Sequence, residues 1–318
     1  SLVAVSMNLL NGFTGLFSLG QAGFMLLGAY AYAVLSIPVD KRAGVYQYFN
    51  GGIVKFSLPE VFSGILGQNV GSVVGMIVAL MIGGLIAALV AYLIGLPVLR
   101  LKSDYLAIAT LGFAEIVRAF FQWNALGPLK SYPDLGGASS YLILIGLFIA
   151  IILLLVNSTY GRAFKAIRDD EIAAEAMGIN LAHHKRLAFI ISSFFAGVGG
   201  GMLAMYMRTV QALSFKITMT YEILLIVVIG GIGSITGSVI TSFLYIASLE
   251  WLLRGLDSGE FLGIQAPGIF KNGFRMAVVS VIIMCVVLFF RKGIMGDREL
   301  SDLLKRKKNT SKGGARNG

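Results

Sequence analysis

The sequence predicts an all-α polytopic membrane protein with about eight spans or broken half-spans. The 318 residues are 57% hydrophobic and only 13% charged, whereas soluble domains average about 45–50% and about 25%, and the mean hydropathy is +0.82. The apolar residues gather in runs of about 20, the length that a helix needs to cross a bilayer. Glycine-rich stretches interrupt two further runs. Such a composition excludes a soluble enzyme, a disordered chain and a disulfide-stapled domain, since Cys285 is the single cysteine.

Six apolar runs are long enough to be complete spans. In chain order they cover residues 16–36, 70–97, 105–124, 140–157, 187–207 and 273–290. The sequence therefore predicts a membrane domain over residues 1–291, followed by a basic tail over 292–318 that is disordered. Because the chain opens at Ser1 without a methionine or a cationic leader, we expect an upstream segment to have been lost or cut.

Two other stretches are predicted to be broken helices. Leu2–Leu10 is apolar but too short for a span, and Gly12-x-x-Gly15 follows it. The run 221–254 is too long for one span and carries Gly230-x-x-Gly233, so it is predicted to be a hairpin of two short helices that turns at the glycines. Non-helical backbone inside a membrane is tolerated only beside protein or a water-filled cavity, and paired interruptions point to a transport site. We expect the breaks to face a pathway, although close helix packing is an alternative explanation of the glycines.

Polar side chains crowd both predicted breaks, and glycine packing explains these less well. The candidate pathway residues are Asn8, Asn11, Thr14, Ser18 and Gln21 around the first break, and Ser234 and Thr236 around the second.

The distribution of basic residues predicts the orientation. The net charge of +10 would suggest nucleic acid as a partner of a soluble protein, but cationic loops beside apolar spans instead mark the cytoplasmic side. If the loop 98–104 is cytoplasmic, that side carries 16 Lys and Arg residues and the other side 8. The bias predicts that the loop 158–186 and the C-terminus are cytoplasmic, and that nucleic acid is not a partner.

The loop 158–186 is predicted to contain a short surface helix at about 169–177. Acidic residues open this segment and Gly178 suits its end. Four apolar side chains, Ile172, Ala173, Ala176 and Met177, share one face. Because so short a helix is marginal in water, we expect it to dock against another component, or alternatively to lie on the membrane surface.

One pair of charged residues falls inside a predicted span. Glu115 and Arg118 are three residues apart in the run 105–124, so their side chains can pair on one helix face. Ionisable residues within a span are costly and usually functional. The pair either fixes helix contacts beside the pathway or is a purely structural ion pair that holds the bundle together.

Sequence signatures of catalysis are missing. The chain has no Gly-Lys dipeptide and therefore no P-loop for nucleotide phosphates. Its two histidines, His183 and His184, are adjacent in a polar loop, which excludes the usual intramembrane zinc motif. No Gly-x-Ser-x-Gly elbow is present. We therefore predict no catalytic residue, no metal site and no cofactor bound by this chain.

Three separated runs carry a family resemblance. They are Gly15–Phe24, Leu96–Arg118 and Gly161–Asn180, and together they resemble the LivM-type permeases of branched-chain amino acid ABC importers. The resemblance implies a homologous second permease, two cytoplasmic ATP-binding subunits that bind ATP and Mg²⁺, and an extracytoplasmic substrate-binding protein. It also implies location in the bacterial inner membrane.

The resemblance further implies that the loop helix is the family's coupling helix, which seats in a cleft of the ATPase. Its predicted residues are Asp169, Asp170, Glu171, Ile172, Ala173, Glu175, Ala176, Met177 and Gly178. The implied function is import of hydrophobic amino acids by alternating access. An importer of urea, short amides or sugars is the alternative within this class, and an ion-coupled secondary transporter is the alternative outside it.

Overall fold

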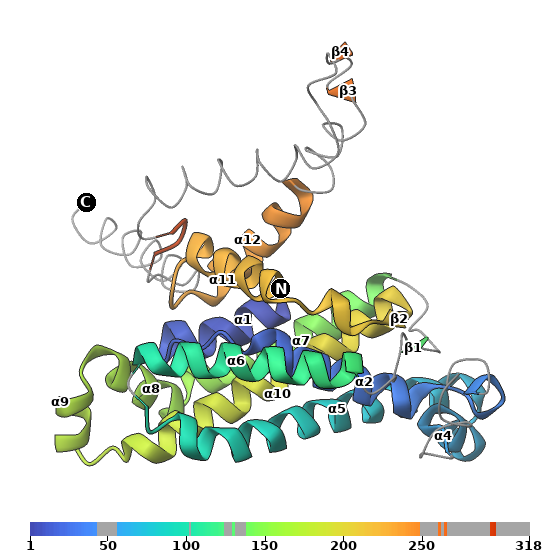
Figure 1. Cartoon of the computed structure of the whole chain (residues 1–318), viewed down its shortest axis with the longest axis horizontal. Coiled ribbons are helices and arrows are strands. Elements are labelled where there is room, and N and C mark those ends of the chain that lie inside the picture. Colours follow the sequence, from blue (N-terminus) through green and yellow to red (C-terminus); the bar gives the residue numbers. More distant parts are fainter. Residues whose placement is uncertain are drawn as a thin grey trace, which may run out of the picture.

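The structure is a computed structural model, shown in Figure 1. It describes residues 1–42, 56–101, 103–123, 129–130, 138–248, 260–261, 264–265 and 293–296. The predicted span 273–290, the domain end at 291 and nearly all of the tail 292–318 lie outside the described residues.

The described part of the chain is dominated by helices. The α-helices are α1 (Leu2–Asn8), α2 (Gln21–Ser36), α4 (Leu58–Leu66), α5 (Gln68–Val98), α6 (Ser103–Trp123), α7 (Ala138–Asn157), α8 (Thr159–Asp169), α9 (Glu171–Ala176), α10 (Leu181–Met207), α11 (Ile217–Gly230) and α12 (Ile235–Ala247). A π-helical turn η1 (Leu9–Phe13) and two 3₁₀ turns, η2 (Val39–Lys41) and η3 (Ala212–Ser214), complete the helical elements. The strands are β1 (Leu129–Lys130), β2 (Thr209–Val210), β3 (Glu260–Phe261) and β4 (Ile264–Gln265).

Four of these helices are long and apolar enough to cross a membrane, namely α5, α6, α7 and α10. They coincide with the predicted spans 70–97, 105–124, 140–157 and 187–207, which are confirmed as long apolar helices. The prediction of a complete span at 16–36 is wrong at its start, because α2 begins only at Gln21 and has 16 residues. Helix α10 starts six residues earlier than predicted, because Asn180 Oδ1 accepts the His183 N–H at 3.0 Å and caps the helix there.

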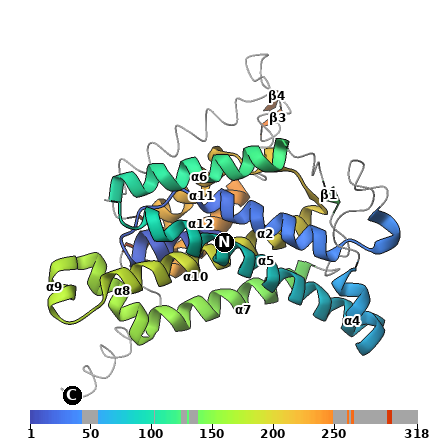
Figure 2. The ribbon, with the colours of Figure 1, turned by 60° about the horizontal axis from the view of Figure 1, so that its bottom comes forward.

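The helices have two distinct ends. At one end, β1 between α6 and α7 pairs antiparallel with β2, which follows α10. At the opposite end lie α8 and α9, which connect α7 to α10 (Figures 1 and 2). The spans α6, α7 and α10 therefore cross between the two ends in alternating directions, as the sequence predicts.

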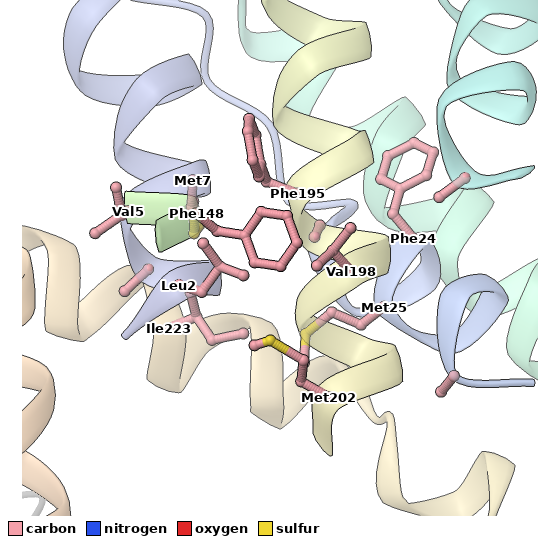
Figure 3. Packing of buried hydrophobic residues seen from close by; sticks show 14 of the residues in the cluster. Leu2, Val5, Met7, Phe24, Met25, Phe148, Phe195, Val198, Met202 and Ile223 are labelled. Carbon is pink, nitrogen blue, oxygen red and sulfur yellow. The ribbon is translucent and has the colours of Figure 1, made fainter. Parts of the chain in front are cut away.

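Helix α10 lies at the centre of the core. Its Phe195, Val198 and Met202 face side chains of α1 and α2 across a continuous apolar cluster (Figure 3). Close backbone contact makes this packing possible, because a Cβ at Gly28 of α2 would overlap the backbone of Gly197 in α10. Small residues at such crossings let helices approach without a side chain between them.

Candidate functional site

The first predicted break is present. The helix that begins with α1 changes to the π-helical turn η1 and ends at Phe13. Gly15 follows with a φ of +73°. Asn11 then holds the non-helical chain, because its Oδ1 accepts the Ser18 N–H at 3.1 Å and its amide donates to the Ser18 carbonyl at 3.5 Å. Thr14 Oγ1 donates to the Leu9 carbonyl at 3.0 Å. These side chains replace the backbone hydrogen bonds that the break removes.

The second predicted break is also present, as a hairpin of α11 and α12. Gly231 and Gly233 turn the chain with φ values of +112° and +91°, which residues with a Cβ rarely adopt. Ser234 Oγ accepts the Gly237 N–H at 3.1 Å and caps α12. The backbone N–H of Ile294 donates to the Ile229 carbonyl at 2.8 Å, so the segment 293–296 satisfies the end of α11.

Asn8 joins the two breaks. Its amide donates to the Ser234 carbonyl at 2.8 Å, to Ser238 Oγ at 2.7 Å and to the Gly231 carbonyl at 3.3 Å. Its Oδ1 accepts the Gly233 N–H at 2.8 Å. The side chain is fully buried, so one residue of the first broken helix supplies hydrogen bonds to the whole turn of the second.

Two other candidate pathway residues do not bond Asn8. Thr236 borders the junction, because its hydroxyl oxygen lies 3.3 Å from that of Ser234. Gln21 lies at the start of α2, where its amide donates to Ser192 Oγ at 2.9 Å. Among the described residues, the buried Gln21 Oε1 and Thr241 Oγ1 have no hydrogen-bond partner. Unpartnered buried oxygens call for water or for a ligand with donors.

Hydroxyls on the neighbouring helices α6 and α11 complete the support of the first break, and they were not predicted. Thr110 Oγ1 of α6 accepts the Leu19 N–H at 3.0 Å, and Thr220 Oγ1 of α11 accepts the Ala22 N–H at 3.3 Å. The sequence feature that could have identified them is the presence of Thr and Ser within otherwise apolar helices. Which break such a hydroxyl serves depends on how the helices pack.

The predicted pairing of Glu115 with Arg118 is present on α6. Arg118 Nη2 lies 2.6 Å from Glu115 Oε2, and Arg118 Nη1 donates to Gln122 Oε1 at 3.2 Å. The two side chains keep 23% and 27% of their surface exposed. In both α6 and α7, only 22% of the residues in the apolar stretch are buried. The exposed surface of α6 is therefore as extensive as that of α7, but α6 is the less apolar of the two helices. Charges exposed to lipid are costly, so this face of α6 is suited to contact protein or water.

The predicted surface helix is shorter than expected and is preceded by another helix. Asp169 is the last residue of α8, and Asp170 caps α9 by accepting the N–H groups of Ile172 and Ala173 at 2.9 and 3.1 Å. The single helix predicted over 169–177 is therefore corrected to α9, because the extended Asp170 interrupts helical backbone. Gly178 ends the segment with a φ of +85°, as predicted.

The apolar face of α9 is open to its surroundings, as predicted. Ile172 and Met177 are 82% and 83% exposed, and Ala173, Glu175 and Ala176 are also exposed. Ala174 is buried instead. Lys185 Nζ lies 2.6 Å from Glu171 Oε2 and ties α9 to α10. A groove of about 630 Å³ separates α8 from α9.

Apart from the groove between α8 and α9, a cavity of about 500 Å³ lies between α1, α7, α10, α11 and α12. Its lining is almost entirely apolar and includes Met202, Ile223 and the carboxylate residue Glu222. None of the candidate pathway residues lines it.

Comparison with known proteins places these features in a family. Residues 1–290 match the model of the family described as branched-chain amino acid transport system, permease component. The high-affinity branched-chain amino acid transport system permease proteins LivM of Escherichia coli and Salmonella typhimurium are each 30% identical over 84% of this chain and 64% of their own length. A probable LivM of Methanocaldococcus jannaschii is 23% identical over 77% of this chain and 76% of its own.

A probable LivH permease of the same archaeon is 28% identical over 49% of this chain and 47% of its own length. No solved structure matches. The chain spans somewhat less than two thirds of the length of the two bacterial relatives, as the 64% coverage shows. Four helices of the described residues are long and apolar enough to span a membrane, which supports a multi-pass membrane protein. The family match covers nearly all of this sequence, and the chain belongs to the branched-chain amino acid transport permease family.

Proposed function

We propose that this chain is the membrane-spanning permease subunit of an ATP-driven importer of branched-chain amino acids. The names of its relatives support this substrate class. The chain would pair with a homologous second permease, with two ATP-binding subunits that carry ATP and Mg²⁺, and with an extracytoplasmic binding protein. Its membrane would be the bacterial inner membrane, with the C-terminus and α8–α9 on the cytoplasmic side.

The exposed helix α9 is the observation that carries the proposal. It projects at one end of the molecule (Figure 1), and it presents Ile172 and Met177 almost fully exposed. Six residues do not form a stable helix alone, but the Asp170 cap and the Glu171–Lys185 ion pair hold this one in place. A prefolded helix with an open apolar face suits docking into the cleft of a cytoplasmic ATPase.

The pathway is proposed to run beside the two breaks and the polar face of α6. Thr110 on α6 already contacts the first break, and the partly exposed pair of Glu115 and Arg118 lies farther along the same helix. A second permease against this face would remove the pair from lipid. The unpartnered Gln21 Oε1 could accept a hydrogen bond from the ammonium group of an amino acid.

Transport would follow alternating access. Closure of the ATPases on ATP would displace α9, and this displacement would rock the spans between inward-open and outward-open states. Hinges of such motions are a few residues that absorb backbone rotation, and the glycine turns at the two breaks provide residues of this kind.

Reconstitution tests the proposal directly. Proteoliposomes that contain this chain, its partner permease and the ATPases, together with the binding protein, should accumulate radiolabelled leucine only with ATP. Ile172→Asp should abolish ATP-driven uptake by preventing ATPase docking, whereas Ile172→Leu, which keeps the apolar surface, should leave it intact. Uptake that persists in the Ile172→Asp complex would contradict the coupling role of α9. Uptake driven by an ion gradient without ATPase would indicate a secondary transporter.

Substrate class is tested on the binding protein. Branched-chain amino acids should raise its melting temperature, and urea, short amides and sugars should not. Stabilisation by urea or a sugar alone would reassign the cargo while leaving the permease role in place.

A further inference from the structure

We propose that Arg168 is a positioning residue that transmits movement of α9 to both broken helices. This inference rests on the proposed function, since it assigns the route by which the coupling segment acts on the membrane domain. Three contacts form the connection. Arg168 contacts Asp169, Arg168 contacts Gly12, and Gly12 contacts Asn8.

Arg168 touches the coupling segment and the first break at the same time. Its Nη1 donates to the Gly12 carbonyl at 3.1 Å, while its Nε and Nη2 donate to Asp169 Oδ1 at 3.0 and 2.9 Å. Gly12 lies in the last turn of η1, where carbonyls have no partner within the helix. The planar guanidinium has donors pointing in different directions, so one side chain satisfies the orphan carbonyl and holds Asp169, the residue before the α9 cap.

The backbones are also close at this point. A Cβ built on Gly15 would lie 3.4 Å from Arg168 Cα, and Lys165 Nζ, one turn earlier on α8, lies 5.4 Å from the ring centre of Phe13. Helix α8 itself is anchored by Phe164 and Ile167, which are buried. The end of α8 and the end of η1 therefore form one packed contact and not a single isolated hydrogen bond.

From Gly12 the connection continues to the second break. A Cβ on Gly12 would overlap Asn8 Oδ1 and lie 2.5 Å from the backbone nitrogen of Gly233. Asn8 in turn bonds Gly233 and Ser234. A shift of the Gly12 carbonyl is thus passed to both glycine turns through atoms in direct contact, since packed interiors transmit displacement.

The first test separates ATP hydrolysis from uptake in the reconstituted complex. Arg168→Gln should leave the ATPase rate within about twofold of the unsubstituted complex but lower leucine uptake per ATP at least about tenfold, equivalent to about 1.4 kcal/mol of coupling. Arg186→Gln is the matched control, because Arg186 lies on α10 over the Tyr92 ring and has no described hydrogen bond to a break. It should keep the normal ratio of uptake to hydrolysis.

The second test replaces the hydrogen bond by a covalent bond. A Cβ at position 15 would lie 3.6 Å from Arg168 Cβ, within the Cβ separation of about 3.5–4.5 Å that a disulfide needs. In a background with Cys285→Ala, Arg168→Cys should lose coupling. Adding Gly15→Cys and oxidising should restore uptake per ATP to within about twofold of the background value, and reduction should abolish it again.

The outcomes are distinguishable. Normal uptake per ATP in Arg168→Gln, or a cross-linked pair that stays uncoupled, would each overturn the role of Arg168 and leave the importer assignment standing. Absence of ATP-driven uptake in the unsubstituted complex would refute the proposed function itself.

Discussion

Replacement of Asn8 by alanine is expected to separate the two broken helices. The substitution removes four hydrogen bonds from the side chain of a fully buried residue. It also leaves the carbonyls of Gly231 and Ser234 and the N–H of Gly233 without this partner. Side-chain hydrogen bonds between membrane helices average about 0.6 kcal/mol and reach about 1.7 kcal/mol. The expected loss in free energy of unfolding is therefore about 2–4 kcal/mol.

The assay is thermal unfolding of the purified permease in detergent, followed by the size-exclusion peak of the folded protein. A loss of this size corresponds to a melting temperature lower by about 3–6 °C for a chain of 318 residues, because the entropy of unfolding is about 2.1 cal/mol/K per residue. Asn157→Ala is the control, because Asn157 is exposed and its amide donates only to the Leu153 carbonyl of its own helix at 2.9 Å.

The control should change the melting temperature by less than about 2 °C. If Asn8→Ala melts as high as Asn157→Ala, Asn8 does not hold the breaks together, and the reasoning from its hydrogen bonds is refuted.

Three further substitutions test other parts of the site. Gly12→Ala places a methyl group against Asn8 Oδ1, and it should sharply reduce the yield of monodisperse protein. Glu115→Gln leaves Arg118 without its anionic partner. Because the pair is about one quarter exposed, the expected loss is about 1–2 kcal/mol in the thermal unfolding assay, less than for a fully buried pair. Asp170→Ala removes the cap of α9, at a cost of about 1 kcal/mol, and it should weaken capture of the ATPase in a pull-down.

Each of these has a matched control and a contrary result. Gly112→Ala should retain the yield, since no described atom outside its own turn of helix lies within 4 Å of the added Cβ, and equal loss in both variants would argue against a specific close contact at Gly12. The double variant Glu115→Gln with Arg118→Gln should recover stability, so a double variant as unstable as the single one would exclude an ion-pair effect. Asp170→Asn keeps an accepting oxygen and should restore ATPase capture. Failure to do so would show that charge, and not capping, matters there.

The complete spans were predictable because hydropathy is a sum over neighbouring residues. Helices α5, α6 and α7 begin and end within a few residues of the apolar runs that predict them. The glycine turns were predictable for a similar reason, since Gly178, Gly231 and Gly233 all adopt positive φ values that other residues rarely take. The pairing of Glu115 with Arg118 follows from helical spacing alone.

Boundaries that depend on competition between hydrogen bonds were predicted less well. The start of α2 depends on whether the chain after Gly15 continues a helix or bonds Asn11 and Thr110. The loop 158–186 contains two helices because Asp170 leaves helical backbone to cap α9. In each case local propensity allows both outcomes, and contacts with the rest of the molecule select one.

Long-range partners could be found only in the folded chain. Asn8 and Ser234 are 226 positions apart, and Arg168 and Gly12 are 156 apart, yet each pair shares a hydrogen bond. Composition and spacing show that these residues are polar, that they lie in or beside apolar segments, and that they therefore need hydrogen-bond partners. They do not specify the partners, because these depend on which helices cross and at what depth. The local order of the chain thus defines the spans and the breaks, whereas helix packing decides how the breaks are joined to each other and to the segment that would move them.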